Sequence, residues 1–197
     1  MEKIAATDRP IESLLARRWS PRVFDPDRTV STEELLTCLE AARWSPSCFN
    51  EQPWRFLIFD AMVPETLDKA RDCLTEGNAW AKQAPVLILP VARKTFTRNN
   101  NPNRFAEYDV GAAILSFVLQ ATALGLFAHQ MAGYNTAKAR AYFGIPDGFE
   151  PQAMVALGYF GSLDALPEAQ RSREIAPRTR IPVSEFAFRG GWGQTLT

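Results

Sequence analysis

The feature that most constrains the fold is an uncharged run of nineteen residues, from Val110 to Ala128. A helix of this length is just long enough to span a bilayer. The run contains Gly111, Gln120 and Gly125, however, and no other segment resembles a membrane span. Because a helix that is apolar on all sides is also typical of a protein core or a subunit interface, we expect a buried helix and no membrane association.

Shorter segments around this run predict strands that alternate irregularly with helices. Strands are expected at 54–59, 85–91, 127–134 (with a turn) and 152–159, and helices at 11–18, 32–44, 64–73, 78–83, 106–124 and 136–143. Ser31 and Glu34 form a capping box before the second helix, Thr136 is the expected cap of the last, and Gly144 ends it.

The tail from Ser162 onward shows no clear periodicity before Ile181. Its apolar end predicts an arm over about 186–197 that packs on a partner subunit. Together the pattern predicts a single domain over 1–197, of α/β or α+β class, in which helices wrap a sheet of four or five strands.

Charge and residue counts exclude several functions. Lys plus Arg and Asp plus Glu are both 22, so the chain lacks the basic surplus of a nucleic-acid binder, although a local basic pocket stays possible. Three cysteines without a CxxC pair indicate a reduced, cytoplasmic setting. His129 is the sole histidine, so no metal site is expected. The first ten residues are charged and have no apolar core, which argues against a signal peptide.

Two groups of arginines are candidates for an anion site. The segment 17–22 reads RRWSPR, and Arg178 and Arg180 are two apart in the tail. Guanidinium groups suit phosphate oxygens because each offers a fork of donors. The alternative is a solvated basic patch at the end of a short helix.

Two further segments offer polar groups or close backbone approach. The loop 45–53 carries neutral hydrogen-bonding side chains between Pro46 and Pro53, which suits a polyhydroxyl chain or a heteroaromatic edge. Gly133, after the predicted strand at 127–134, would let backbone amides approach a ligand. The alternatives are an ordinary connection and a plain turn, with a structural role for His129 beside it and a buried thiol at Cys48.

The order of these pieces along the chain resembles the nitroreductase family of FMN-dependent oxidoreductases. The most specific piece is PSCFNEQPW at 46–54, preceded by RWSPRVF at 18–24. NAW at 78–80, DVGAA at 109–113, LGL at 124–126, Gly133 and RTRIP at 178–182 follow. The resemblance covers the chain from Ile11 to about Glu185. It implies an α+β nitroreductase-like fold with a central mixed or antiparallel sheet, assembled as a homodimer around the long helix.

The resemblance also implies the cofactor contacts, which come from two subunits. The FMN phosphate and ribityl chain would be bound in one subunit by Arg18, Trp19, Ser20, Arg22, Arg178 and Arg180. The flavin ring would be lined from the partner by Pro46, Ser47, Cys48, Asn50 and Gln52. Met131, Ala132 and Gly133 would follow the third strand, with the amides of Ala132 and Gly133 near flavin N5.

The implied reaction is a ping-pong transfer of hydride from NADH or NADPH to FMN, then to an electron-poor acceptor such as a nitroaromatic or a quinone. No catalytic side chain is implied, because the flavin carries the chemistry. The alternatives are dehalogenation, dehydrogenation or flavin cleavage within the family, or a non-catalytic flavin binder. Trp19 and Cys48 depart from the Arg or His and the Ser that the family often has there.

Overall fold

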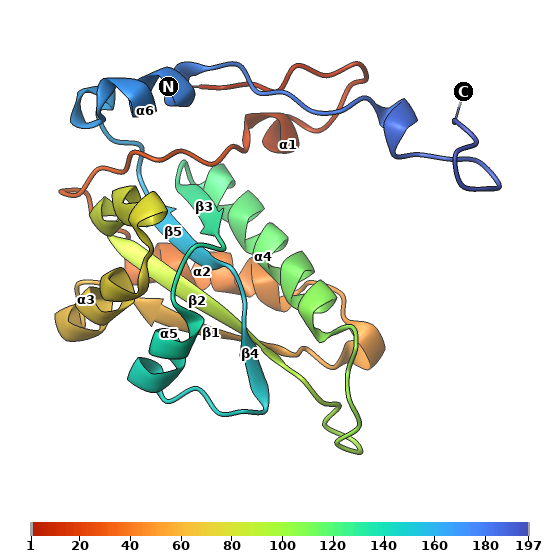
Figure 1. Cartoon of the computed structure of the whole chain (residues 1–197), viewed down its shortest axis with the longest axis horizontal. Helices are drawn as coiled ribbons and strands as arrows, with labels where there is room; N and C mark the ends of the chain where they lie inside the picture. Colours follow the sequence, from red (N-terminus) through yellow and green to blue (C-terminus); the bar gives the residue numbers. More distant parts are fainter. Residues whose placement is uncertain (1, 197) are drawn as a thin grey trace.

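Every pairing between strands in the described chain is antiparallel. The computed structural model describes residues 2–196. Its strands are β1 (Trp54–Phe59), β2 (Val86–Arg93), β3 (Phe127–Met131), β4 (Phe149–Pro151) and β5 (Met154–Gly158). They form a five-stranded sheet in the order β1-β2-β5-β3, with β4 paired to the end of β2 (Figure 1). The expectation of a sheet of four or five strands is confirmed, and its pairing is antiparallel rather than mixed.

Helices cover both faces of this sheet. The α-helices of the described chain are α1 (Ser13–Arg17), α2 (Thr32–Arg43), α3 (Pro64–Cys73), α4 (Ala106–Ala123), α5 (Thr136–Phe143) and α6 (Glu168–Ile175), of which α2 to α5 cover the sheet. Short 3₁₀ helices are η1 (Cys48–Asn50), η2 (Glu76–Gln83), η3 (Leu163–Ala165) and η4 (Val183–Glu185).

Strand β2 explains why the sheet is covered on both sides. Val86 and Ile88 pack into one core with α2 and α4, whereas Leu87 and Leu89 pack into a second core with α3 and α5. Successive side chains of a strand point to opposite faces, so a strand between two cores needs an uninterrupted apolar run. The sequence at 85–91 has that run.

Helix α4 buries one side and leaves a stripe open. Val110, Phe117 and Val118 are buried, but Tyr108 is 78% exposed and Leu115 is 47% exposed. Between residues 2 and 196, no helix is long and apolar enough to cross a membrane. We expected the helix of the uncharged run to be buried. In the single chain this holds for one side of α4, and the other side is exposed.

The N-terminal cap expected from the sequence is present at α2, whereas the cap of α5 is a different residue from the one expected. The capping box of Ser31 and Glu34 is present at α2. At α5 the cap is Asn135, whose side chain accepts a hydrogen bond from the Lys138 amide, so the expectation of Thr136 was wrong by one residue. Both residue types cap helices well, so composition alone does not choose between neighbours. Gly144 ends α5 in the left-handed conformation, as expected.

The tail holds a helix that the sequence pattern does not reveal. Helix α6 is rich in charged residues, and Glu174 is buried within it. Hydrophobic periodicity therefore gives no signal there. The strand expected at 152–159 is also shorter in the structure: β5 covers Met154–Gly158, and residues 152 and 153 connect it to β4.

The N-terminal and C-terminal segments of the chain share a layer above β3 and β5 (Figure 1). The N-terminal segment, α1, α6 and the tail form this layer, and residues beyond η4 run out past the body. Phe186 is 58% exposed and Trp192 is 92% exposed on that extension.

Candidate functional site

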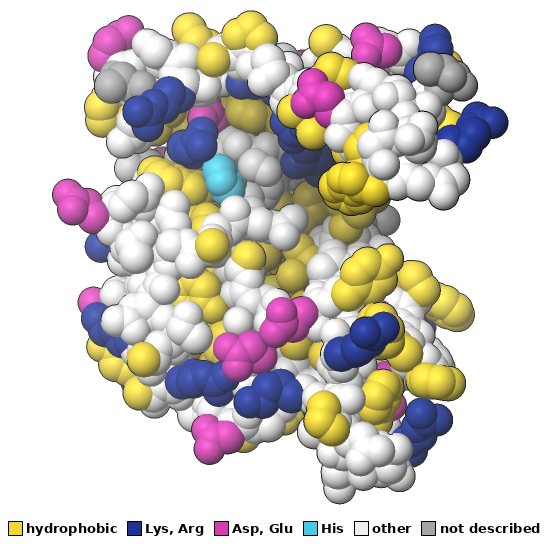
Figure 2. Space-filling view, turned by 45° about the vertical axis from the view of Figure 1, so that its right-hand side comes forward, with side chains coloured by type: hydrophobic (Ala, Val, Ile, Leu, Met, Phe, Trp, Pro, Cys, Tyr) yellow, Lys and Arg dark blue, Asp and Glu magenta, His cyan; other side chains and the backbone are white. Residues whose placement is uncertain are grey.

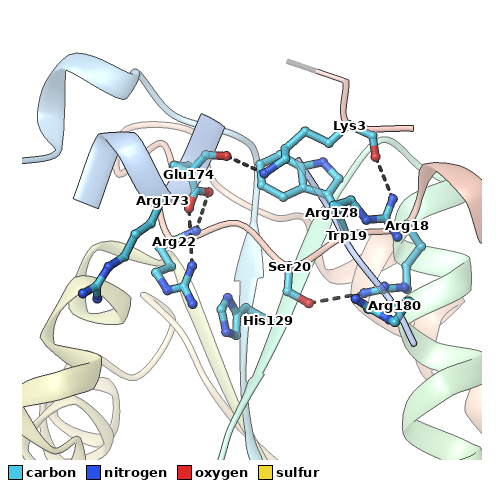
Figure 3. Close-up of a pocket in the computed structure, with 10 residues that line it drawn as sticks. All are labelled: Lys3, Arg18, Trp19, Ser20, Arg22, His129, Arg173, Glu174, Arg178 and Arg180. Atoms are coloured by element: carbon cyan, nitrogen blue, oxygen red, sulfur yellow. Dashed lines mark hydrogen bonds and ion pairs between the residues drawn. The ribbon is translucent and has the colours of Figure 1, made fainter. Parts of the chain in front are cut away.

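A basic cavity of about 310 Å³ lies beneath the layer formed by the chain ends. We call it the cation pocket, and its lining residues are Lys3, Arg18, Trp19, Ser20, Arg22, His129, Arg173, Glu174, Arg178 and Arg180 (Figure 3). The pocket thus brings together all six residues that the resemblance assigned to the phosphate and ribityl chain of the cofactor. Lys3, His129, Arg173 and Glu174 were not predicted to line it, because only the fold brings them there.

The pocket concentrates positive charge that repels itself. Burial lowers the pKa of Arg18, and the nearby charges of Arg178 and Arg180 lower it further. The pKa of Arg178 is lowered by burial and by Arg180 in the same way. Arg18 Nη1 also donates to Ser20 Oγ at 3.3 Å. Neighbouring guanidinium groups repel one another, and a bound anion would offset this repulsion. The pocket is therefore suited to bind an anion.

Glu174 lies on the opposite side of the pocket and contacts Arg22. Its side chain is 1% exposed, and Oε1 accepts a hydrogen bond from the Arg22 amide at 2.8 Å. Oε2 lies 3.7 Å from Arg22 Nη1. In Figure 3, Arg22 lies beside this carboxylate and the Arg173 side chain extends away from it, whereas the three remaining arginines lie on the other side of Ser20 and His129. A buried carboxylate with a charged partner fixes the position of that partner.

His129 lies between these two groups of arginines. Its Nδ1 is 2.8 Å from the Pro21 carbonyl oxygen, which can only accept, so Nδ1 carries the hydrogen. Burial lowers the pKa of His129, and Arg22 lowers it further. The sole histidine is visible in the hollow below the upper layer, with basic side chains nearby (Figure 2). A neutral ring in this position leaves Nε2 as a hydrogen-bond acceptor.

The end of β3 presents backbone groups at a tight crossing. The Gly133 carbonyl accepts from Thr75 Oγ1 and Asn78 Nδ2, each at 2.9 Å. A Cβ at Gly133 would lie 2.6 Å from Asn78 Nδ2, so a larger residue does not fit. Within residues 2–196 the amides of Ala132 and Gly133 donate no hydrogen bond, which leaves both available. The predicted ligand Met131 is 3% exposed and packs in the core, so its side chain is not accessible.

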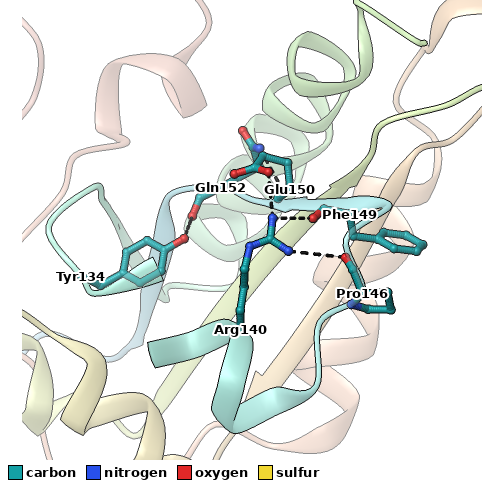
Figure 4. A network of polar contacts seen from close by, with 6 residues as sticks. All are labelled: Tyr134, Arg140, Pro146, Phe149, Glu150 and Gln152. Atoms are coloured by element: carbon teal, nitrogen blue, oxygen red, sulfur yellow. Dashed lines mark hydrogen bonds and ion pairs between the residues drawn. The ribbon is translucent and has the colours of Figure 1, made fainter. Parts of the chain in front are cut away.

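The segment after β3 is held by a polar network (Figure 4). Tyr134 Oη donates to the Gln152 carbonyl at 2.7 Å. Arg140 Nη2 donates to the Phe149 carbonyl and to Glu150 Oε2, both at 2.7 Å. The Arg140 bonds tie α5 to β4, and a hollow of about 300 Å³ that Ala132 helps to line lies beside them. The position of the free amides is therefore fixed by the fold.

The loop 45–53 lies elsewhere in the single chain. Pro46, Ser47 and Cys48 line a separate open hollow of about 370 Å³ with Phe105, Tyr108 and Asp109. The chain does not join this hollow to the cation pocket. Asn50 is exposed, and Gln52 is half-buried with its Nε2 bonded to the Asn50 carbonyl at 3.0 Å.

Asp109 is a residue whose role the sequence did not reveal. It is 3% exposed, and its Oδ2 accepts from the Cys48 amide at 3.0 Å. In the sequence it stands out only as the first residue of the DVGAA piece at 109–113, near the start of the predicted helix 106–124. An acid at the start of an otherwise apolar helix is the signal that could have indicated a buried partner.

The loop itself contains strained backbone. Phe49, Asn50 and Gln52 have φ values of 53°, 55° and 48°, which non-glycine residues rarely adopt. Contacts with the segment 95–102 oppose this strain: Glu51 accepts from Thr97, and Arg98 lies 4.3 Å from the centre of the Phe49 ring. Strain that neighbouring contacts maintain is common at ligand sites.

No group of three or more His, Cys, Asp or Glu residues is placed to hold a metal ion in the described part of the chain.

Comparisons with known proteins agree with these features. The model of the Nitroreductase family matches residues 15–159. An uncharacterized 15.4 kDa protein of Mycolicibacterium smegmatis is 39% identical over 132 residues, which are 67% of this chain and 88% of that protein. The crystal structure of an oxidoreductase containing FMN is 35% identical, with a TM-score of 0.90 and 97% of each chain covered. A nitroreductase family protein of Clostridium difficile 630 is 28% identical, with a TM-score of 0.71 over 90% of this chain and 96% of that one.

Proposed function

Because the chain belongs to the nitroreductase family, we propose that it is an FMN-dependent oxidoreductase that takes hydride from NADH or NADPH. The second substrate would be an electron-poor acceptor such as a nitroaromatic or a quinone. The observation that carries the proposal is the cation pocket, in which burial and the charges of Arg178 and Arg180 lower the pKa of Arg18. The similar oxidoreductase that contains FMN supports the choice of cofactor.

The donor set of the chain fits FMN. A phosphate dianion requires several charge-assisted donors, and Arg18, Arg180 and Ser20 supply them on one side of the pocket. Arg22 supplies a further cation on the other side, held by Glu174. The free amides of Ala132 and Gly133 match a ring nitrogen that gains electron density on reduction.

When bound, FMN supplies two-electron hydride exchange at its N5 atom. The chain's part is to bind, orient and polarise. The arginines retain the phosphate, and the amides of Ala132 and Gly133 would donate toward N5 and favour the reduced state. Thr75 and Asn78 hold the Gly133 carbonyl and so keep these amides in place. Protons for the acceptor can come from water, so no side chain is assigned as a catalytic acid or base.

The complete site is proposed to form in a homodimer. Pro46, Ser47 and Cys48 are remote from the cation pocket of their own chain and would serve the pocket of the partner. The exposed stripe of α4 at Tyr108 and Leu115 and the apolar extension beyond η4 are surfaces that a second copy would cover. A cytoplasmic location is proposed because Cys38, Cys48 and Cys73 are all free thiols.

Steady-state kinetics with two varied substrates test the proposal. Parallel reciprocal plots for NADPH or NADH against a nitroaromatic or a quinone are expected, because the reductant must leave before the acceptor enters. Light scattering should give a mass about twice 22.0 kDa. Intersecting plots would contradict the ping-pong order, and a stable monomer with full activity would contradict the shared site.

A further inference from the structure

The N-terminal segment reaches the cation pocket through Lys3, which the family match does not cover. The matched range is 15–159, and Lys3 lies before it. Arg173, Glu174, Arg178 and Arg180 lie after it. This chain therefore completes the pocket with residues from both of its ends.

Four hydrogen bonds fix the position of the segment that carries Lys3. The Ala5 amide donates to the Ala16 carbonyl at 3.0 Å, which attaches the segment to α1. Arg178 Nη1 donates to the Lys3 carbonyl at 2.6 Å and to the Ala16 carbonyl at 2.8 Å. Lys3 Nζ donates to the Glu174 carbonyl at 2.6 Å. Backbone and side chain of Lys3 are thus both attached to the walls of the pocket.

The ammonium group keeps donors for a ligand. An ammonium has three N–H bonds, and the Glu174 carbonyl takes one of them. The ammonium lies 4.9 Å from the centre of the Trp19 ring, and this aromatic face attracts the positive charge without occupying a directed donor. Arg178, in contrast, uses Nη1 on two backbone carbonyls, so part of its role is to hold the segment in place.

We propose that Lys3 is a phosphate-binding residue, and that the N-terminal segment is a strap by which this chain selects the phosphorylated flavin over riboflavin. The inference rests on the proposed function, since it assigns the phosphate of FMN to this pocket. Riboflavin shares the ring and ribityl chain of FMN but lacks the phosphate, so a residue that binds only the phosphate distinguishes the two.

Titration of the flavin-stripped full-length chain with FMN and with riboflavin tests the proposal through flavin fluorescence. Lys3→Met is expected to raise the Kd for FMN about tenfold and to leave the Kd for riboflavin unchanged. Lys3→Arg, which keeps the charge, should stay close to wild type. Lys69→Met is the matched control, because Lys69 is exposed on α3 and outside the pocket.

The outcomes separate this inference from the proposed function. If the wild-type chain binds FMN but Lys3→Met binds it within twofold of wild type, the role of Lys3 is refuted. Equal weakening of FMN and riboflavin would also refute it, because the loss would not depend on the phosphate. A wild-type chain that binds neither flavin would refute the proposed function itself. If Lys3→Met fails to fold, Lys3→Gln with the same two ligands gives the same comparison.

Discussion

Replacing Arg18 and Arg180 together by alanine should release FMN without destabilising the flavin-free protein. A hydrogen bond to a charged group contributes about 1.5–3 kcal/mol, so two lost contacts would cost roughly 3–6 kcal/mol. Arg180 is exposed and Arg18 only half-buried, and other cations remain in the pocket, so the lower end applies. A loss of about 3 kcal/mol is roughly a hundredfold rise in Kd.

The flavin-free double variant gives the complementary result. Because Arg180 and burial lower the pKa of Arg18, these charges oppose folding in the absence of an anion. Removing them should leave the free energy of unfolding within about 1 kcal/mol of wild type, or raise it.

The assay combines fluorescence titration with FMN and urea unfolding of the flavin-free chain. Arg43→Ala with Arg71→Ala is the matched control, since both arginines lie outside the cation pocket and each pairs with an acid one helical turn away. An FMN affinity within threefold of wild type would refute the reasoning. A hundredfold loss in the control as well would also refute it.

Three further changes have expected outcomes. Gly133→Ala should lower the free energy of unfolding in urea by about 1–3 kcal/mol, because its Cβ would lie 2.6 Å from Asn78 Nδ2. Gly148→Ala is the control, since no atom lies within 4 Å of its Cβ, and equal effects of the two changes would contradict the close packing at Gly133. Asp109→Ala should lower the free energy of unfolding by about 1–3 kcal/mol, because it leaves the Cys48 amide unpaired. Asp109→Asn keeps an acceptor and should lower it clearly less. Equal losses in the two variants would exclude this hydrogen bond as the cause. Burial lowers the pKa of His129, so the unfolded chain binds its proton first, and stability should fall as the pH drops below about 6.5. Urea unfolding across pH 5–7 should show a flatter profile for His129→Asn, and an unchanged slope would show that another group titrates.

Much of the fold could be predicted because its signals are local. The run at 85–91 predicts a strand between two cores, and β2 has that place. The capping box at Ser31 predicts the start of α2. Helix α6 could not be found this way, because it is attached through Glu174 and Lys3 rather than through an apolar face.

The candidate site likewise contains residues that local sequence signals predict and residues that only tertiary contacts reveal. The spacing of the arginines predicts an anion site, and the structure brings them into one pocket. Lys3 and Glu174 could not be predicted, since their roles depend on contacts between opposite ends of the chain. Asp109 and the strained loop likewise depend on a contact between segments 61 residues apart.

The most direct test of the account is the visible absorption spectrum of the purified protein before and after anaerobic addition of NADPH or NADH. Flavin bands that bleach with either nicotinamide are the predicted result, because the cation pocket should retain FMN and the site should admit the reductant. Flavin bands that persist with both would contradict the proposed reductase. A protein that stays colourless after incubation with FMN would contradict the assignment of the pocket to this cofactor.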